Sequence, residues 1–235
     1  MHLQLDDVHT HYGSSHILFG IHLEVTEGRV VCLLGRNGAG KTTTMRTIMG
    51  LARTSRGKIA YNGKNIVGAE PHDIARMGIG FVPDDRIIFP DLTVRENLEI
   101  AARKGPGAEK FDWTIDKIYD LFPVLRRLDR HMGAYLSGGE QQMLTVGRTL
   151  MGNPLLLLLD EPVEGVAPIV VQELGEKIRT LKAMGLTILM AEQNLHFATQ
   201  ISDYAYVIEK GLIRYQGTMV DLAENEQVKQ KYLMI

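Results

Sequence analysis

The sequence has a single cysteine, Cys32, and no uninterrupted apolar run that approaches the length of a membrane span. A lone cysteine excludes a disulfide within the chain, which is typical of proteins that work in a reducing compartment. Cys32 lies inside the apolar run 30–34, so we expect a buried and unreactive thiol. The longest apolar runs, such as 155–159, are far shorter than the roughly 18 residues that a membrane helix needs. A membrane role would therefore require docking onto another protein.

The sequence also lacks an excess of positive or negative charge. The chain of 235 residues has 26 Lys and Arg against 28 Asp and Glu, a net charge of −2, and no block of like charges. Proteins that bind nucleic acid neutralise phosphates with clustered cations, so this balance argues against a DNA or RNA partner. Residues 1–7 carry acidic residues where a secretory signal would begin with basic ones, and we expect no such signal.

Three apolar segments are typical of buried strands that lead into helices or functional turns: 30–34, 155–159 and 187–191. Together they predict an α/β core with a parallel sheet. The dipeptide of Asn62 and Gly63 favours a type I′ hairpin, and a second β-rich piece, 206–215, turns at Lys210 and Gly211. Antiparallel strands are therefore expected to flank the parallel core.

A helix-rich stretch interrupts this core between about residues 85 and 151. Thr93 and Glu96 have the spacing of a capping box ahead of apolar residues. No linker is long enough to separate independent domains, and the length suits one large domain. We expect a single domain over residues 1–235, with a core formed by 1–84 and 152–235 and an inserted α-helical subdomain at about 85–151.

A phosphate-binding loop follows the first buried strand and precedes the helical run 43–49. Glycines in such a loop let backbone N–H groups turn toward phosphates, and the helix N-terminus adds positive potential. In the P-loop pattern, Lys41 reaches the β and γ phosphates of ATP and Thr42 ligates Mg²⁺. The predicted nucleotide contacts are Gly35, Arg36, Asn37, Gly38, Ala39, Gly40, Lys41, Thr42 and Thr43.

Two acids follow the apolar run 155–159, at the carboxyl edge of the predicted sheet. Nucleotide sites of open α/β folds lie at this edge. Asp160 is expected to hold Mg²⁺, directly or through water, and Glu161 to act as the general base that polarises the attacking water. Two acids after a strand more often mark only a solvated strand end, but the P-loop upstream favours the catalytic interpretation.

The motif Leu136, Ser137, Gly138, Gly139, Glu140, Gln141, Gln142 precedes a long helical run. A serine and two glycines at a helix start present N–H groups and a hydroxyl to an anion, while Ser137 and Glu140 also have the spacing of a capping box. With this motif the sequence resembles the ABC ATPase family. In that family the residues corresponding to Ser137, Gly138, Gly139 and Glu140 close over the γ-phosphate of ATP bound to the opposite subunit. The resemblance implies that two chains form one complete site.

Three further assignments depend on the resemblance. Tyr12 matches the aromatic residue that stacks on adenine, although packing is the commoner role for an aromatic residue at such a position. Asp84 follows residues 81–83 where many members carry glutamine, and it is expected near the metal. Gln193 stands where many carry a histidine; it can donate a hydrogen bond to phosphate but cannot carry a proton. His196, one helical turn beyond Gln193, is a weaker candidate for that histidine's role.

These departures leave an alternative open: a regulatory nucleotide-binding half of an asymmetric ATPase pair, with weak hydrolysis. The presence of Lys41, Thr42, Asp160 and Glu161 favours active hydrolysis. A non-transport ABC ATPase of translation or DNA repair is a second alternative. Such proteins usually fuse two ATPase units or insert long coiled coils, and this chain does neither.

The same departures carry a narrower resemblance over nearly the whole chain. Glu-Gln-Asn at 192–194, the acid at 84, and the stretches 88–94 and 165–168 are similar to the ATPases of branched-chain amino-acid importers. This resemblance implies an ATPase at the cytoplasmic face of the membrane, with permease subunits, a second ATPase subunit and an external solute-binding protein as partners. Relatives of that group import urea, short amides or aromatic acids, so the transported solute stays open.

Overall fold

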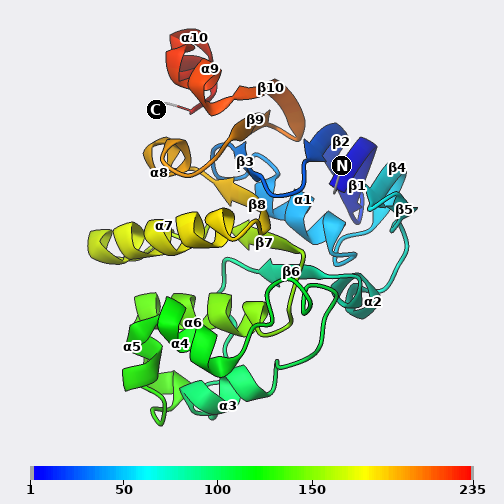
Figure 1. Ribbon diagram of the computed structural model, residues 1–235. Coiled ribbons are helices and arrows are strands. Elements are labelled where there is room, and N and C mark those ends of the chain that lie inside the picture. The colour runs from blue at the N-terminus through cyan, green and yellow to red at the C-terminus, as the bar shows by residue number, and fades with distance from the viewer. Residues whose placement is uncertain (1–2, 234–235) are drawn as a thin grey trace.

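Two β-sheets form the framework of the protein, and helices cover them (Figure 1). This computed structural model describes residues 3–233. The strands are β1 (Leu3–Tyr12), β2 (Ser15–Val25), β3 (Val30–Leu34), β4 (Thr54–Tyr61), β5 (Lys64–Asn65), β6 (Ile79–Val82), β7 (Leu156–Asp160), β8 (Thr187–Glu192), β9 (Tyr204–Glu209) and β10 (Leu212–Thr218). The helices are α1 (Lys41–Ile48), α2 (Pro71–Arg76), α3 (Val94–Glu99), α4 (Ile115–Leu121), α5 (Pro123–Arg127), the 3₁₀ turn η1 (Gly133–Tyr135), α6 (Gly138–Leu150), α7 (Pro168–Ala183), α8 (Leu195–Thr199), α9 (Met219–Glu224), α10 (Glu226–Val228) and the π turn η2 (Lys229–Leu233).

The larger sheet has the strand order β10-β9-β3-β8-β7-β6, in which β9, β3, β8, β7 and β6 run parallel and β10 pairs antiparallel. Every residue of β3, β7 and β8 is buried, as expected for strands covered on both faces. The predicted α/β class with a mostly parallel sheet is confirmed. Because parallel strands end at one edge, the segments that follow β3, β6, β7 and β8 meet there.

The smaller sheet is antiparallel, with the order β2-β1-β4-β5. Its β4–β5 hairpin turns at Asn62 and Gly63, both with positive φ (48° and 79°). The β9–β10 hairpin turns in the same way at Lys210 and Gly211 (49° and 74°). Two successive positive φ values characterise the type I′ turn, so both predicted hairpins are confirmed.

Helices α3 to α6 lie between β6 and β7 in the chain and group together on one side of the larger sheet, away from the antiparallel strands (Figure 1). We call α3–α6 the helical group. The capping box of Thr93 and Glu96 is present at the start of α3. The exact division of the chain at residues 84 and 152 stays a prediction.

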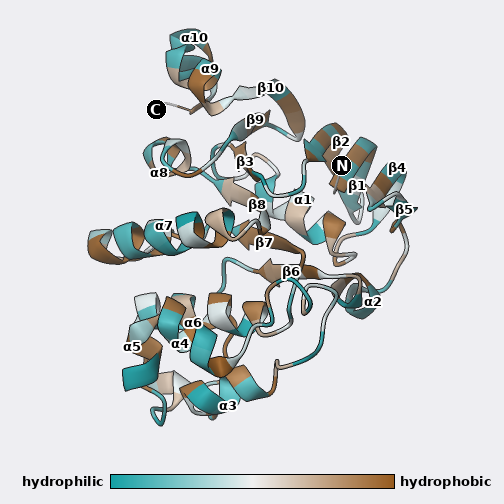
Figure 2. Cartoon of the chain, in the orientation of Figure 1, coloured by the Kyte–Doolittle hydropathy of each residue, from teal (hydrophilic) through white to brown (hydrophobic). Residues whose placement is uncertain are grey.

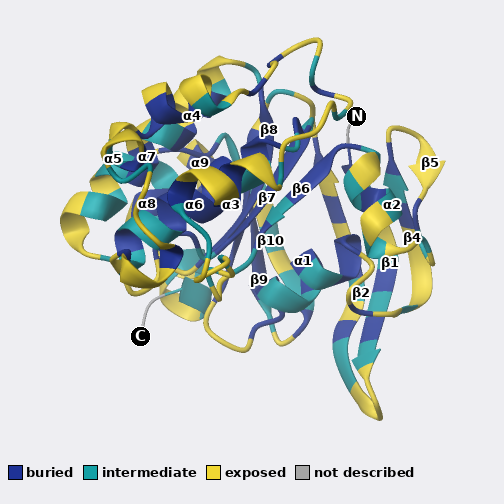
Figure 3. Cartoon of the chain, turned by 90° about the horizontal axis from the view of Figure 1, so that it is seen from below, coloured by how far each residue is buried: buried dark blue, intermediate teal, exposed yellow. Residues whose placement is uncertain are grey.

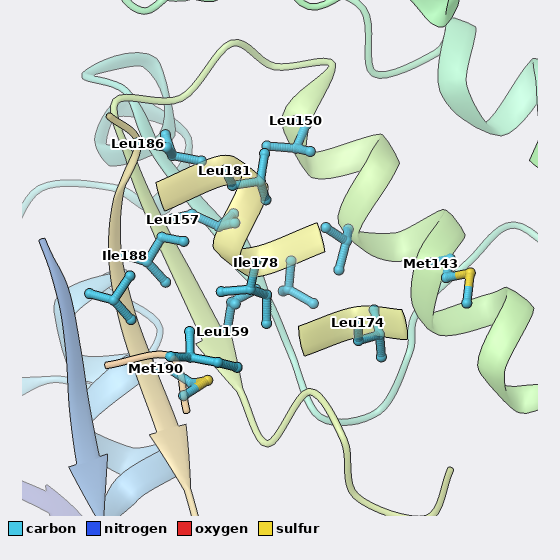
Figure 4. Close-up of a cluster of buried hydrophobic side chains, with 14 of the residues drawn as sticks. Met143, Leu150, Leu157, Leu159, Leu174, Ile178, Leu181, Leu186, Ile188 and Met190 are labelled. Atoms are coloured by element: carbon cyan, nitrogen blue, oxygen red, sulfur yellow. The ribbon is translucent and has the colours of Figure 1, made fainter. Parts of the chain in front are cut away.

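Helix α7 packs between the larger sheet and the helical group (Figure 4). Its residues Leu174, Ile178 and Leu181 share one face, at the spacing of an amphipathic helix, and contact Leu157 and Leu159 of β7. Leu156 and Leu158 belong to the other core, between the two sheets. Alternate residues of one strand therefore fill two different cores. Figure 2 shows the apolar strands at the centre, and Figure 3 shows that exposed positions gather on the outer helices and turns.

Cys32 of β3 is fully buried, and burial raises the pKa of its thiol well above the ordinary value. The expectation of a buried thiol is confirmed. Within residues 3–233, no helix combines the length and the apolar character that crossing a bilayer demands.

Candidate functional site

The loop between β3 and the start of α1 contains two glycines, Gly35 and Gly40, that lie close to neighbouring atoms. A Cβ on Gly35 would lie 2.5 Å from the main-chain oxygen of Ile208, so only glycine fits there. Gly40, at φ 114°, precedes α1, and no side chain caps this helix. Uncapped N–H groups at a helix N-terminus form an anion site.

Lys41 is the buried cation of this loop, with only 3% of its surface exposed. Its Nζ donates hydrogen bonds to the main-chain oxygens of Gly35 (2.8 Å) and Arg36 (3.0 Å) and lies 3.0 Å from Oε1 of Glu161. A pocket of about 250 Å³ opens beside it, lined by Ile17, Gly38, Gly40, Lys41, Thr42, Thr43 and Glu161. A phosphate that enters this pocket meets an ammonium group and a carboxylate together.

Asp160, at the end of β7, is fully buried. Thr42 Oγ1 donates to its Oδ1 (3.2 Å), whereas its Oδ2 has no hydrogen-bond partner among residues 3–233. Burial raises the pKa of Asp160 to about 7, against the hydrogen bond from Thr42, and the charges of Asp84 and Glu161 raise it further. An unsatisfied buried carboxylate oxygen is costly, and a divalent cation would satisfy it.

The oxygens of Thr42 and Asp160 are the ligand type that Mg²⁺ prefers. Asp84 follows β6, and its Oδ1 lies 3.9 Å from a guanidinium nitrogen of Arg46. Among the described residues no three His, Cys, Asp or Glu side chains form a metal cluster by themselves. That small donor set fits Mg²⁺, which usually keeps several waters and shares substrate phosphates with one or two carboxylates.

Glu161 has a left-handed backbone conformation (φ 46°), and its N–H donates to the main-chain oxygen of Ala191 on β8 (3.0 Å). This bond fixes the residue directly after β7, and its side chain is largely buried. A hydrogen bond with the Glu161 carboxylate raises the pKa of the Glu164 carboxyl group. Glu161 is therefore held between Lys41 and Glu164.

Gln193 lies just beyond β8 and is exposed. Its N–H donates to Oε2 of Glu192 (3.0 Å), as does the N–H of Asn194 (3.1 Å). Glu192 is buried, and burial raises its pKa to about 7. Within the part of the chain that the structure describes, its Oε1 has no hydrogen-bond partner. No role was predicted for Glu192 itself, which entered the predictions only as part of the motif 192–194. Its position at the end of an apolar strand is the pattern that could have indicated a buried acid. His196 of α8 pairs instead with Gln200, the residue after this helix (2.8 Å).

The start of α6 is capped by its own side chains. Ser137 and Glu140 form a reciprocal capping box, in which Oε2 of Glu140 accepts from the backbone N–H of Ser137 (2.7 Å). A Cβ on Gly139 would lie 2.8 Å from a methyl group of Val170, so glycine permits close packing of α6 on α7. Ser137 is exposed. The structure thus places residues 137–140 in the helical group and not on the sheet edge.

Tyr12 ends β1 and is 45% exposed. The preceding Thr10 is buried, and its hydroxyl contacts the hydroxyl of Thr47 on α1 (3.0 Å). This contact holds the β1–β2 hairpin against α1, and Ile17 from the same hairpin lines the phosphate pocket. An exposed ring on a fixed strand is available for stacking.

Residues 18–164, more than half of the chain, match the family described as ABC transporter. The chain is 42% identical to the high-affinity branched-chain amino acid transport ATP-binding protein BraG of Pseudomonas aeruginosa, over 98% of this chain and 99% of that protein. It is 36% identical to the probable branched-chain amino acid transport ATP-binding protein LivF of Archaeoglobus fulgidus, over 92% of each. A solved ATP-binding cassette in its ADP conformation has a TM-score of 0.83 and 27% identity, over 97% of both chains.

Proposed function

This chain belongs to the ABC transporter family and is one of its ATP-hydrolysing subunits, and from that premise we propose that it energises the import of branched-chain amino acids or a related small amide or acid. The solute assignment is supported by the similarity to BraG and LivF. The observation that carries the chemistry is the pocket beside Lys41, because a buried cation, an unsatisfied buried carboxylate and a fixed second carboxylate adjoin it.

In the proposed reaction, Lys41 binds the β and γ phosphates of ATP, and Thr42 and Asp160 hold Mg²⁺. The metal, when bound, would neutralise charge on the phosphate oxygens. Glu161 orients the attacking water and accepts its proton, as a general base must within hydrogen-bond reach. Gln193 donates a hydrogen bond to the γ-phosphate, and Tyr12 stacks on the adenine.

We further propose that a complete site needs two chains, one contributing residues 35–43 and the other residues 137–140. The exposed start of α6 supports this arrangement, since Ser137 and Gly138 lie on the helical group and not beside the pocket of the same chain. The second ATPase subunit is either a copy of this chain or a different one. ATP binding would favour the closed pair, and hydrolysis would reopen it.

A groove between the core and the helical group supports the proposed permease contact. It has a volume of about 380 Å³ and is lined by Met49, Ala75, Ile79, Gly80, Phe81, Ile100, Ala101, Ala102, Arg103, Arg148, Thr149 and Gly152. Ile100, 63% exposed, lies at its rim. A cytoplasmic helix of a permease subunit would bury this apolar surface. The chain would then act at the cytoplasmic face of the membrane and engage a solute-binding protein only through the permease.

Glu161→Gln tests the proposal in the purified chain. Glutamine keeps the size of the side chain but cannot accept the proton, so we expect turnover to fall by about 100-fold or more while ATP binding persists. Light scattering should then show an ATP-dependent dimer that accumulates in the variant. Glu209→Gln, at the half-exposed end of β9, is the matched control and should behave as the wild type.

A wild-type chain that binds ATP but neither dimerises nor hydrolyses it would favour the alternative, a regulatory half of an asymmetric ATPase pair. That alternative replaces this proposal if a partner ATPase restores turnover and Glu161→Gln does not reduce it. The solute is tested separately, by reconstituting the chain with its permease and measuring ATP-dependent uptake of labelled leucine. Uptake of a short amide in place of leucine would reassign the solute.

A further inference from the structure

The segment between β6 and α3 is held to the helical group. Arg148 of α6 donates a hydrogen bond to the main-chain oxygen of Ile87, and its guanidinium lies 5.0 Å from the centroid of the Phe89 ring. Asn97 of α3 also binds the Phe89 main chain. Its Oδ1 accepts from the Phe89 N–H (2.9 Å), and its Nδ2 donates to the Phe89 oxygen (3.0 Å). Residues 87–89 are therefore bound to α3 and α6.

Arg86 reaches from this segment to a loop of the core. Its Nη2 donates a hydrogen bond to the main-chain oxygen of Glu164, and a Cβ on Gly165 would lie 3.4 Å from the same nitrogen. On the other side, a Cβ on Gly138 would lie 2.7 Å from its Nη1. The guanidinium thus lies between the first turn of α6 and the loop that follows β7.

Two unfavourable features accompany this placement. Arg86 has a left-handed backbone (φ 47°), a conformation that is unfavourable for a residue with a long side chain. A cation beside a helix N-terminus also opposes the helix dipole. Backbone outliers of this kind persist where surrounding structure enforces them, and they cluster at functional sites.

The contacted loop leads directly to the proposed general base. The N–H of Glu164 donates to the main-chain oxygen of Glu161 (3.1 Å), which closes a turn over residues 161–164. A donor that holds the main-chain oxygen of Glu164 therefore restrains the turn that orients Glu161.

We propose that Arg86 is a positioning residue for ATP hydrolysis, which ties the helical group to the turn 161–164 so that displacement of α6 is transmitted to Glu161. This inference rests on the proposed catalytic role of Glu161. Arg86 acts through Glu164 and does not line the phosphate pocket. Its loss should consequently alter the chemical step and leave nucleotide binding intact.

Steady-state kinetics of Arg86→Ala and Arg86→Lys test the inference. Loss of one charge-assisted hydrogen bond should lower kcat about tenfold, with KM for ATP changed by less than about twofold. Lysine can still donate to the Glu164 oxygen, so Arg86→Lys should recover part of kcat. Arg95→Ala is the matched control, because Arg95 pairs with Asp129 inside the helical group (3.0 Å) and should leave kcat unchanged.

Hydrogen exchange supplies a readout that does not require turnover. In Arg86→Ala the amides of residues 161 and 163–166 should exchange faster than in the wild type and in Arg95→Ala, while thermal unfolding excludes global destabilisation. Unchanged exchange, or a rise in KM with constant kcat, would overturn the inference. If Glu161→Gln retains full activity, the proposed function fails, yet the exchange experiment still decides whether Arg86 restrains the turn.

Discussion

Two helix starts in this molecule, those of α1 and α6, are built in opposite ways. Helix α1 follows a glycine turn, has no capping side chain and opens into a pocket with a buried lysine. Helix α6 begins with a complete capping box between Ser137 and Glu140, and its cap residue Ser137 is exposed. The first leaves its N–H groups available to a phosphate, whereas the second already satisfies part of its own donors. We therefore expect the N-terminus of α1 to bind nucleotide within one chain. The N-terminus of α6 would bind phosphate only when a partner subunit brings its nucleotide close.

The acids follow the same division. Asp160 and Glu192, on the core strands, are buried, and burial raises both pKa values to about 7. One carboxylate oxygen of each has no hydrogen-bond partner among the described residues. Glu96, in the capping box of α3, has a lowered pKa because the backbone N–H and the hydroxyl of Thr93 donate to it. The nucleotide edge thus carries unfavourable electrostatics that a bound cation can relieve, while the capping acid of α3 is locally satisfied.

Lys41→Ala should produce the largest effect. It removes the only buried cation that lines the pocket, and two charge-assisted contacts to phosphate correspond to a loss of about 100-fold or more in ATP affinity. Equilibrium binding of a fluorescent ATP analogue measures this loss. Lys104→Ala, at an exposed lysine, is the control. Undiminished binding by Lys41→Ala would remove the contrast between the two helix starts.

Glu192→Gln should stabilise the protein in alkaline solution. Since the pKa of Glu192 is raised from 4.5 to about 7, the folded state binds its proton more tightly, and ionisation costs stability as pH rises through this window. With about 1.4 kcal/mol for each pKa unit, the rise from 4.5 to about 7 corresponds to a gain for the variant on the order of 3–4 kcal/mol at pH 9 and to no gain below about pH 4.5. Denaturant unfolding at several pH values measures the difference.

The matched control for that experiment has the opposite sign. Glu96 has a lowered pKa, so its contribution is present above about pH 4.5 and disappears as pH falls through the folded pKa. Glu96→Gln should therefore be less stable than the wild type at pH 7 and equal to it in acid. Equal signs for the two variants would contradict the division between buried core acids and satisfied capping acids.

Ser137→Ala and Thr93→Ala separate capping from phosphate binding. Each removes the cap of an exposed capping box and should cost about 1 kcal/mol of stability. Only Ser137→Ala should also lower ATP turnover, by about tenfold, because only that hydroxyl faces the phosphate of a partner subunit in the proposed pair. Thermal unfolding and turnover of both variants test this, and equal turnover would leave Ser137 as a cap alone.

Much of this architecture was predictable because its determinants are local. The hairpins at Asn62 and Gly63 and at Lys210 and Gly211 follow from residues that tolerate positive φ. The capping boxes need only two side chains three residues apart, and the buried strands need only continuous apolar runs. The site roles assigned from these patterns, from Tyr12 to Gln193, stay predictions that the experiments above address.

The sequence by itself determined the α/β class, the P-loop, the two acids at the end of β7 and the family to which the chain belongs, since each is encoded within a few adjacent residues. The tertiary structure alone decided which of these segments meet. Thr42 contacts Asp160 across 118 residues, and Arg86 reaches Glu164 across 78. It also decided that Glu192 is buried without a partner for one oxygen. Such contacts depend on sheet order and helix packing, because burial and pairing are properties of neighbours in space and not of neighbours in the chain.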